Sequence, residues 1–159
     1  MGLDRAMVRR CELAGRLHDV GKALIPKEIW TKKEKLTDAE WDLIRTHPDH
    51  GWRLLREVPE LGDVAEIVRQ HHERMDGRGY PNGLLGPDIL IEARIVTVCD
   101  CWAAMLAERV YHAPLTEDAA CAELLAGRGT RYDPRVVDTF VGLWRTGAIG
   151  RLKRLTASE

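Results

Sequence analysis

Histidines end three apolar stripes that have the residue spacing of an α-helix. The stripes are Met7, Cys11, Ala14 and His18; Leu43, Ile44 and His47; and Val64, Ile67, Val68 and His71, which His72 follows. Stripe positions face the core, and a buried imidazole without a partner is costly, so each ring needs a hydrogen bond or a metal ion. For one histidine alone, a hydrogen-bonded core residue is the more common explanation.

Further candidate ligands stand beside these histidines. Asp19 follows His18, and His72 follows His71. Neighbouring side chains on a helix are about 100° apart around its axis, so each doublet can serve two ions, with Asp19 bridging them. Asp100 is a further candidate because small residues around it on a predicted helix leave room for a carboxylate. Mixed imidazole and carboxylate ligands suit iron, manganese, zinc or nickel, and not calcium. The sequence therefore predicts an interior site for two divalent transition-metal ions.

The elements that must position these residues are helices, and we predict an all-α bundle of about six to seven of them. Local signals mark several starts: the capping-box residues 37–40, Pro48, Thr116, and Asp133 with Pro134. Glycines and prolines between residues 73 and 90 exclude a continuous helix and predict a long structured loop, in which glycines take positive φ. No segment alternates with period two. Helices are expected over roughly 5–20, 38–46, 48–57, 62–72, 91–111 and 116–126, and from 133 onward.

The composition limits the classes of partner. The 24 Lys and Arg residues against 25 Asp and Glu residues give a formal net charge of −1, which argues against long nucleic acids and leaves a small anionic ligand open. No apolar run approaches the ~20 residues of a membrane span, and the first residues lack an apolar signal-peptide core. The cysteines show no paired zinc spacing, so we expect free thiols that serve as small core residues in a cytoplasmic protein. These cysteines are Cys11, Cys99, Cys101 and Cys121.

Two longer motifs resemble a known family. HDVGK at residues 18–22 is similar to the HD signature of metal-dependent phosphohydrolases, and HHERMDGRGYP at residues 71–81 resembles the HHExxDGxGYP signature of the HD-GYP group. Shorter matches with the family's spacing lie between and after them, including His47-Pro48, Asp100 and Asp133-Pro134. The resemblance covers roughly residues 10–140. It implies a domain over residues 1–149 with a polar tail over 150–159.

The resemblance also implies an activity, the hydrolysis of cyclic di-GMP to pGpG, with a second cut to GMP left open. Asp19 and Lys22 would act in catalysis, and Lys22 and Arg109 would contact a substrate phosphate. Asp76 and Tyr80 would contribute to substrate binding or tie the loop down by hydrogen bonds. Two other functions stay open: a noncatalytic signalling module, and an HD phosphohydrolase for another nucleotide. The metal ligands implied are His18, Asp19, His47, His71, His72 and Asp100.

The chain departs from the family pattern at three places. The family has an earlier helix with a Glu and a His ligand, to which nothing in this sequence can be assigned. Ala103 stands where the family usually has an Asp, and His112 where a second phosphate-binding cation is expected. We therefore expect a weakened or inactive enzyme and an exposed apolar groove next to the metal site. The chain should either self-associate through that groove or be only marginally stable. The family also suggests an upstream receiver or regulatory domain, and docking of a diguanylate cyclase domain on the loop over residues 77–83.

Overall fold

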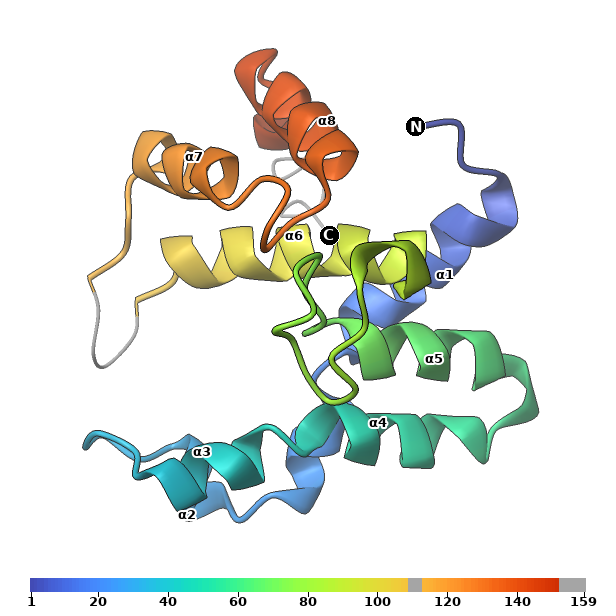
Figure 1. The fold of residues 1–159 in the computed structure, drawn as a ribbon, viewed down its shortest axis with the longest axis vertical. Helices are drawn as coiled ribbons and strands as arrows, with labels where there is room; N and C mark the ends of the chain where they lie inside the picture. The colour runs from blue at the N-terminus through green and yellow to red at the C-terminus, as the bar shows by residue number, and fades with distance from the viewer. Residues whose placement is uncertain (109–112, 152–159) are drawn as a thin grey trace.

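The computed structural model describes residues 1–108 and 113–151, and within them it contains eight α-helices, short 3-10 turns and no β-strand (Figure 1). The predicted all-α class is confirmed. The helix number exceeds the expected six to seven because α2 is a single short turn. The helices are α1 (Arg5–Leu17), α2 (Lys27–Trp30), α3 (Asp38–Ile44), α4 (His47–Arg56), α5 (Gly62–Gln70), α6 (Ile91–Leu106), α7 (Glu117–Ala126) and α8 (Pro134–Arg145).

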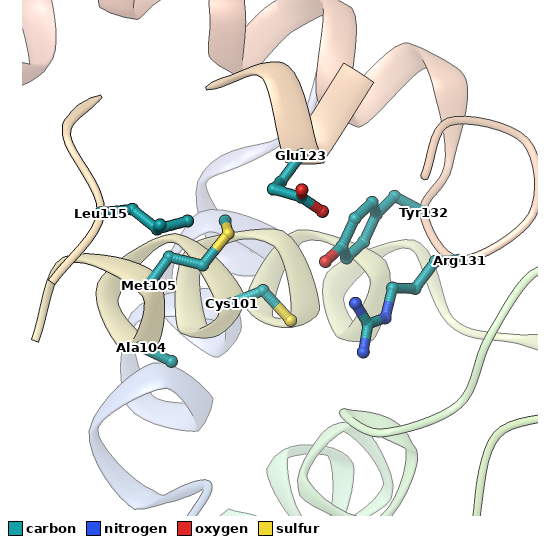
Figure 2. Close-up of a pocket in the computed structure, with 7 residues that line it drawn as sticks. All are labelled: Cys101, Ala104, Met105, Leu115, Glu123, Arg131 and Tyr132. Carbon is teal, nitrogen blue, oxygen red and sulfur yellow. The ribbon is translucent and has the colours of Figure 1, made fainter. Parts of the chain in front are cut away.

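Helix α6 is the central element and lies between two sets of helices (Figure 1). Ala93 and Val96 of α6 belong to a core with α1, α4 and α5. Val98 and Trp102 belong to a second core with α7 and α8, against which Ile91 and Ile95 also pack. Helix α6, which carries Asp100, therefore contributes to both cores. Figure 2 shows a pocket that opens between α6 and α7 on the side of the second core.

The predicted helix starts are confirmed, because each start signal is a local interaction. Thr37 and Glu40 form the capping box of α3. The Thr116 hydroxyl accepts from the backbone N–H of Ala119 at the start of α7, and Asp133 caps α8 in the same way. Such bonds satisfy backbone donors that the first helical turn leaves without partners.

Three predictions about helix ends and faces are wrong. Helix α1 ends at Leu17, and α6 ends at Leu106 instead of near residue 111, because Ala107 takes an extended conformation. His47 begins α4 and does not continue the stripe of α3, where Leu43 is 47% exposed. The cysteines are free as expected, but only Cys121 is buried.

The loop before α6 is ordered by its own hydrogen bonds. Asp76 and Leu85 form an isolated antiparallel bridge, and Gly77 and Gly83 have φ values of +73° and +65°. At these two positions the left-handed backbone favours glycine, as the sequence predicts. Arg94 of α6 joins the loop to α8 by donating to the carbonyl of Ile89 and to the Asp133 carboxylate. No helix in residues 1–108 and 113–151 has the length and apolarity needed to cross a membrane.

Candidate metal centre

The candidate ligands lie at helix ends that face α6. His18 and His71 are the C-terminal caps of α1 and α5, and His47 is the first residue of α4. Gly21 allows the segment after α1 to touch α4, since a Cβ atom at this position would lie 2.0 Å from the carbonyl oxygen of His47. No larger residue fits there without moving the backbone. The glycine of the HDVGK motif therefore brings the His18 segment against His47.

Backbone carbonyls determine which nitrogen carries the proton on three of the imidazoles. The Nδ1 atoms of His18, His47 and His71 lie 2.8, 2.8 and 2.6 Å from the carbonyl oxygens of Gly15, Ile44 and Val68. A carbonyl oxygen only accepts hydrogen bonds, so each Nδ1 must donate, and each neutral ring presents a lone pair at Nε2. Metal-bound histidines in proteins usually have this arrangement.

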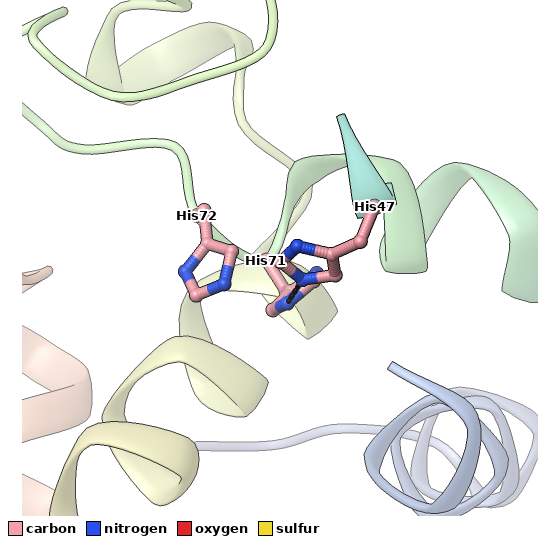
Figure 3. Close-up of side chains that lie close together, drawn as sticks. All are labelled: His47, His71 and His72. Atoms are coloured by element: carbon pink, nitrogen blue, oxygen red, sulfur yellow. Dashed lines mark hydrogen bonds between the residues drawn. The ribbon is translucent and has the colours of Figure 1, made fainter. Parts of the chain in front are cut away.

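His47, His71 and His72 form a compact group, which we call the imidazole triad (Figure 3). One ligand atom from each ring lies within 4.8 Å of the others. The Nε2 atoms of His47 and His71 are 3.3 Å apart, and both rings are buried. Because both nitrogens present lone pairs, their contact is repulsive unless a cation lies between them. The triad therefore has a donor set that fits a metal ion, and His47 and His71 have the matching tautomers.

A second group, which we call the acidic edge, completes the site with His18, Asp19, Lys22 and Asp100. The Nε2 atom of His18 lies 3.5 Å from Asp100 Oδ1 and 3.6 Å from Asp19 Oδ2. The other oxygen of Asp19 lies 3.4 Å from His47 Nε2, so this carboxylate stands between the edge and the triad. Lys22 Nζ donates to Asp19 Oδ2 at 2.6 Å. The structure therefore brings together all six predicted metal ligands and Lys22.

Burial keeps the triad neutral. It lowers the pKa of His71 to about 4, and together with the neighbouring imidazoles it lowers that of His72 to about 2. Burial also lowers the pKa of His47. Neutral rings are the form that binds metal ions, so protons do not compete for the triad at pH 7.

The acidic edge has the opposite electrostatic character. The hydrogen bond with Asp100 raises the pKa of His18. Burial alone would raise the pKa of Asp100, but the hydrogen bond with His18 and the nearby imidazoles lower it to about 2. Asp100 is therefore ionised near neutral pH and supplies negative charge for cations.

The remaining predicted site residues lie around this centre. The Tyr80 ring stacks on His72, with the ring centroids 4.7 Å apart. The Asp76 carboxylate accepts from the Arg74 side chain at 3.0 and 2.6 Å and from the backbone N–H of Arg78, contacts that tie the loop down. Arg109 and His112 lie outside the described residues.

Two residues that the sequence analysis did not single out support the site. Glu73 is 2% exposed and accepts from the backbone N–H groups of Asn82 and Leu84 at 2.7 and 2.9 Å. The Thr97 hydroxyl donates to the carbonyl of His71. Glu73 directly follows the His71-His72 doublet, and a charged residue next to buried positions is a signal that could have identified it.

Several comparisons place the chain among known proteins. Residues 1–136 match the HD domain family. The chain is 44% identical over 145 residues to the cyclic di-GMP phosphodiesterase response regulator RpfG of Xanthomonas campestris. This alignment covers 89% of this chain and 38% of the relative. It is 40% identical over 157 residues to the cyclic di-GMP phosphodiesterase PA4108 of Pseudomonas aeruginosa, over 95% of this chain and 37% of the relative.

Other relatives are named for a different cyclic dinucleotide. The chain is 39% identical over 145 residues to 3′3′-cGAMP-specific phosphodiesterase 2 of Vibrio cholerae, over 90% of this chain and 28% of the relative. The crystal structure of the V. cholerae cyclic GMP-AMP specific phosphodiesterase V-cGAP3 superposes with a TM-score of 0.67 at 17% identity, over 91% of this chain and 40% of that chain. That likeness shows the fold alone.

This chain spans 38% and 37% of the length of the Xanthomonas and Pseudomonas relatives. The match over residues 1–136 covers the helices that carry all the candidate ligands. The chain belongs to the HD domain family, and its resemblance to the HD-GYP group is confirmed.

Proposed function

We propose that this domain is a metal-dependent phosphodiesterase that hydrolyses cyclic di-GMP to pGpG. The observation that carries the proposal is the convergence of imidazole Nε2 lone pairs and carboxylates from α1, α4, α5 and α6 on one point. The names of the Xanthomonas and Pseudomonas relatives support the same substrate. A second cut to GMP belongs to the same proposal.

Different residues of the chain would bind the metal ions and the substrate phosphate at such a site. The triad would hold one divalent ion, and His18 and Asp100 would hold a second, with Asp19 between them. Iron, manganese, zinc and nickel suit this mixed ligand set. Bound divalent ions would supply Lewis acidity and a lowered pKa for water. Lys22 is paired with Asp19 through one proton and is 36% exposed, so its other protons can stabilise negative charge on a substrate phosphate.

A second candidate substrate is 3′3′-cGAMP. It is favoured by the three V. cholerae relatives named as specific for this dinucleotide, which are 39%, 36% and 35% identical to the chain. The two substrates share the phosphodiester chemistry and differ in one base. The substrate choice therefore depends on contacts to the bases and not on the metal centre.

The test is anaerobic purification, elemental analysis and a hydrolysis assay with cyclic di-GMP and 3′3′-cGAMP. We expect transition-metal ions in the wild type, product formation, and loss of turnover in His18→Ala and Asp19→Ala. Asp42→Ala is the matched control for Asp19→Ala, because Asp42 pairs with Arg45 on the surface of α3. A folded, metal-free protein that ignores both dinucleotides would favour a noncatalytic signalling module. Turnover of another nucleotide alone would favour a different HD phosphohydrolase.

Further roles are proposed on the family resemblance. The loop over residues 77–83 would dock a diguanylate cyclase domain, the protein would act in the cytoplasm, and a receiver or other regulatory domain would control it. Self-association would use the groove of about 420 Å³ between α1 and α6, which Cys11, Gly15 and Ile95 line beside His18 and Asp100. Sedimentation over a range of protein concentrations tests that last role, since a monomer at every concentration contradicts it.

A further inference from the structure

A second hollow lies on the other side of α6, with a volume of about 460 Å³ (Figure 2). Ala104, Met105 and Leu115 supply apolar surface, and Glu123, Arg131 and Tyr132 supply polar groups. In Figure 2 the Glu123 carboxylate enters from α7, and the Tyr132 and Arg131 side chains enter from the segment before α8. Apolar walls with a few polar groups are typical of pockets for small molecules.

The pocket adjoins the metal centre through α6. Asp100 lies in the centre, and the next residue, Cys101, lines the pocket together with Tyr132. Ala104 lies one helical turn after Asp100 on α6 and also lines the pocket. A group attached to a phosphate at the metal centre would therefore extend along α6 toward the pocket.

The two charged side chains of the pocket are available for a ligand. The neighbouring Arg128 pairs with Asp138 at 2.6 Å. By contrast, Arg131 contacts the Tyr132 ring and forms no ion pair with any carboxylate in residues 1–108 and 113–151. Glu123 likewise forms no ion pair with a cationic side chain in residues 1–108 and 113–151. An acid and a base that face one pocket without neutralising each other suit a ligand with both hydrogen-bond donors and acceptors.

We propose that this pocket binds one guanine base of the cyclic dinucleotide, with Glu123 and Arg131 recognising opposite hydrogen-bonding groups of the base. The proposal rests on the proposed function. A guanidinium donates in pairs to guanine O6 and N7, and a carboxylate accepts from guanine N1–H and the 2-amino group. Adenine presents an acceptor at N1, which would oppose the Glu123 carboxylate, and an amino group at C6, which would oppose Arg131. The pocket therefore selects guanine.

The names of the relatives agree with a pocket for one guanine. Cyclic di-GMP and 3′3′-cGAMP each contain at least one guanine, and two relatives that are both 39% identical to this chain are named for one and for the other. A single guanine pocket serves both dinucleotides, since it leaves the second base unspecified. Cyclic di-AMP, which has no guanine, should be the poor substrate.

The test compares Arg131→Met and Glu123→Gln with wild type on cyclic di-GMP, cyclic di-AMP and bis(p-nitrophenyl) phosphate, all with manganese-loaded protein. Arg131→Met should lower kcat/KM for cyclic di-GMP relative to bis(p-nitrophenyl) phosphate by roughly 10–100-fold, mainly through KM. Glu123→Gln should lower the preference for cyclic di-GMP over cyclic di-AMP by about 10-fold, because a glutamine amide can pair with adenine. Arg128→Met is the matched control, since Arg128 pairs with Asp138 on the surface, and it should change neither ratio.

Equal losses on all three substrates, or unchanged ratios in both variants, would overturn the pocket assignment. Calorimetric titration with cyclic di-GMP and cyclic di-AMP separates this inference from the proposed function. If the wild type hydrolyses nothing but binds cyclic di-GMP in preference to cyclic di-AMP, and Arg131→Met abolishes that preference, the phosphodiesterase activity is refuted and the guanine pocket is supported. A wild type that hydrolyses both dinucleotides equally well would support the phosphodiesterase and refute the pocket.

Discussion

The two halves of the candidate metal centre differ in burial and in charge. In the imidazole triad, His47 and His71 are 1% and 0% exposed, and burial lowers the pKa of all three rings. At the acidic edge, the side chains of Asp19 and Lys22 are 42% and 36% exposed. A closed neutral half holds ligand geometry without competition from protons, and an open charged half admits a phosphate. The comparison suggests that the triad determines metal retention and that the edge determines turnover.

The largest expected effect follows His71→Ala, because His71 lies against both His47 and His18. Metal affinity should fall by more than the roughly 10–100-fold that a supporting residue contributes. The buried cavity should also lower the free energy of unfolding by about 1–3 kcal/mol. Elemental analysis and urea unfolding measure the two effects. Retention of the wild-type metal content would contradict the assignment of the triad.

Asp19→Asn comes next and separates the two halves. Asparagine keeps the size of the side chain but removes the charge between His18 and His47. We expect hydrolysis to be lost while the triad keeps part of the bound metal. Asp42→Asn should retain wild-type metal content and rate. If Asp19→Asn lost all its metal, the two halves would not be separable.

Lys22→Met tests the edge as a phosphate contact. Removal of one charged donor to a developing phosphate charge should lower kcat by roughly 10²-fold, with metal content unchanged. Lys27→Met on α2 is the matched control, since Lys27 is exposed. Steady-state kinetics with elemental analysis of the same preparations is the measurement. If Lys22→Met also loses metal, the role of Lys22 is to position Asp19 and not to contact the phosphate.

Glu73→Gln should affect the loop beside the triad. The carboxylate accepts from two backbone N–H groups, and an amide can replace only one of these bonds, at a cost of about 1–3 kcal/mol. Urea unfolding should show this loss, and hydrogen exchange should increase at Asn82 and Leu84. Glu57→Gln on the exposed end of α4 should leave both measurements unchanged. Unaltered exchange in Glu73→Gln would mean that other contacts hold the loop.

Ala103→Asp should have the smallest effect, and it is a gain. Ala103 lies beside His18 and Asp100 in the groove between α1 and α6 and is exposed, so a carboxylate fits without repacking. A new hydrogen bond to the ligands should raise metal affinity up to about 10-fold. Competition with a chelator measures the change. A lower metal affinity in Ala103→Asp would show that the acidic edge does not tolerate a further negative charge.

Much of the fold was predictable because its signals act within a few residues. Thr37, Thr116 and Asp133 cap helices through bonds to backbone groups two or three positions away. Helix ends were less predictable, since α6 stops where packing of the next segment begins, with Leu115 donating to the carbonyl of Met105. The role of Glu73 was missed because its partners lie nine and eleven residues further along a loop.

The sequence by itself determined the chemical types of the site and the local structure that carries them: the two doublets, the aspartate of α6, the helix starts and the glycines of the loop. Only the tertiary structure decided that His18 meets Asp100, that Asp19 stands between His18 and His47, and that one half of the site is more buried than the other. The reason is physical. Residue types and caps depend on near neighbours in the chain, whereas burial, tautomers and pKa values depend on groups that only packing brings together.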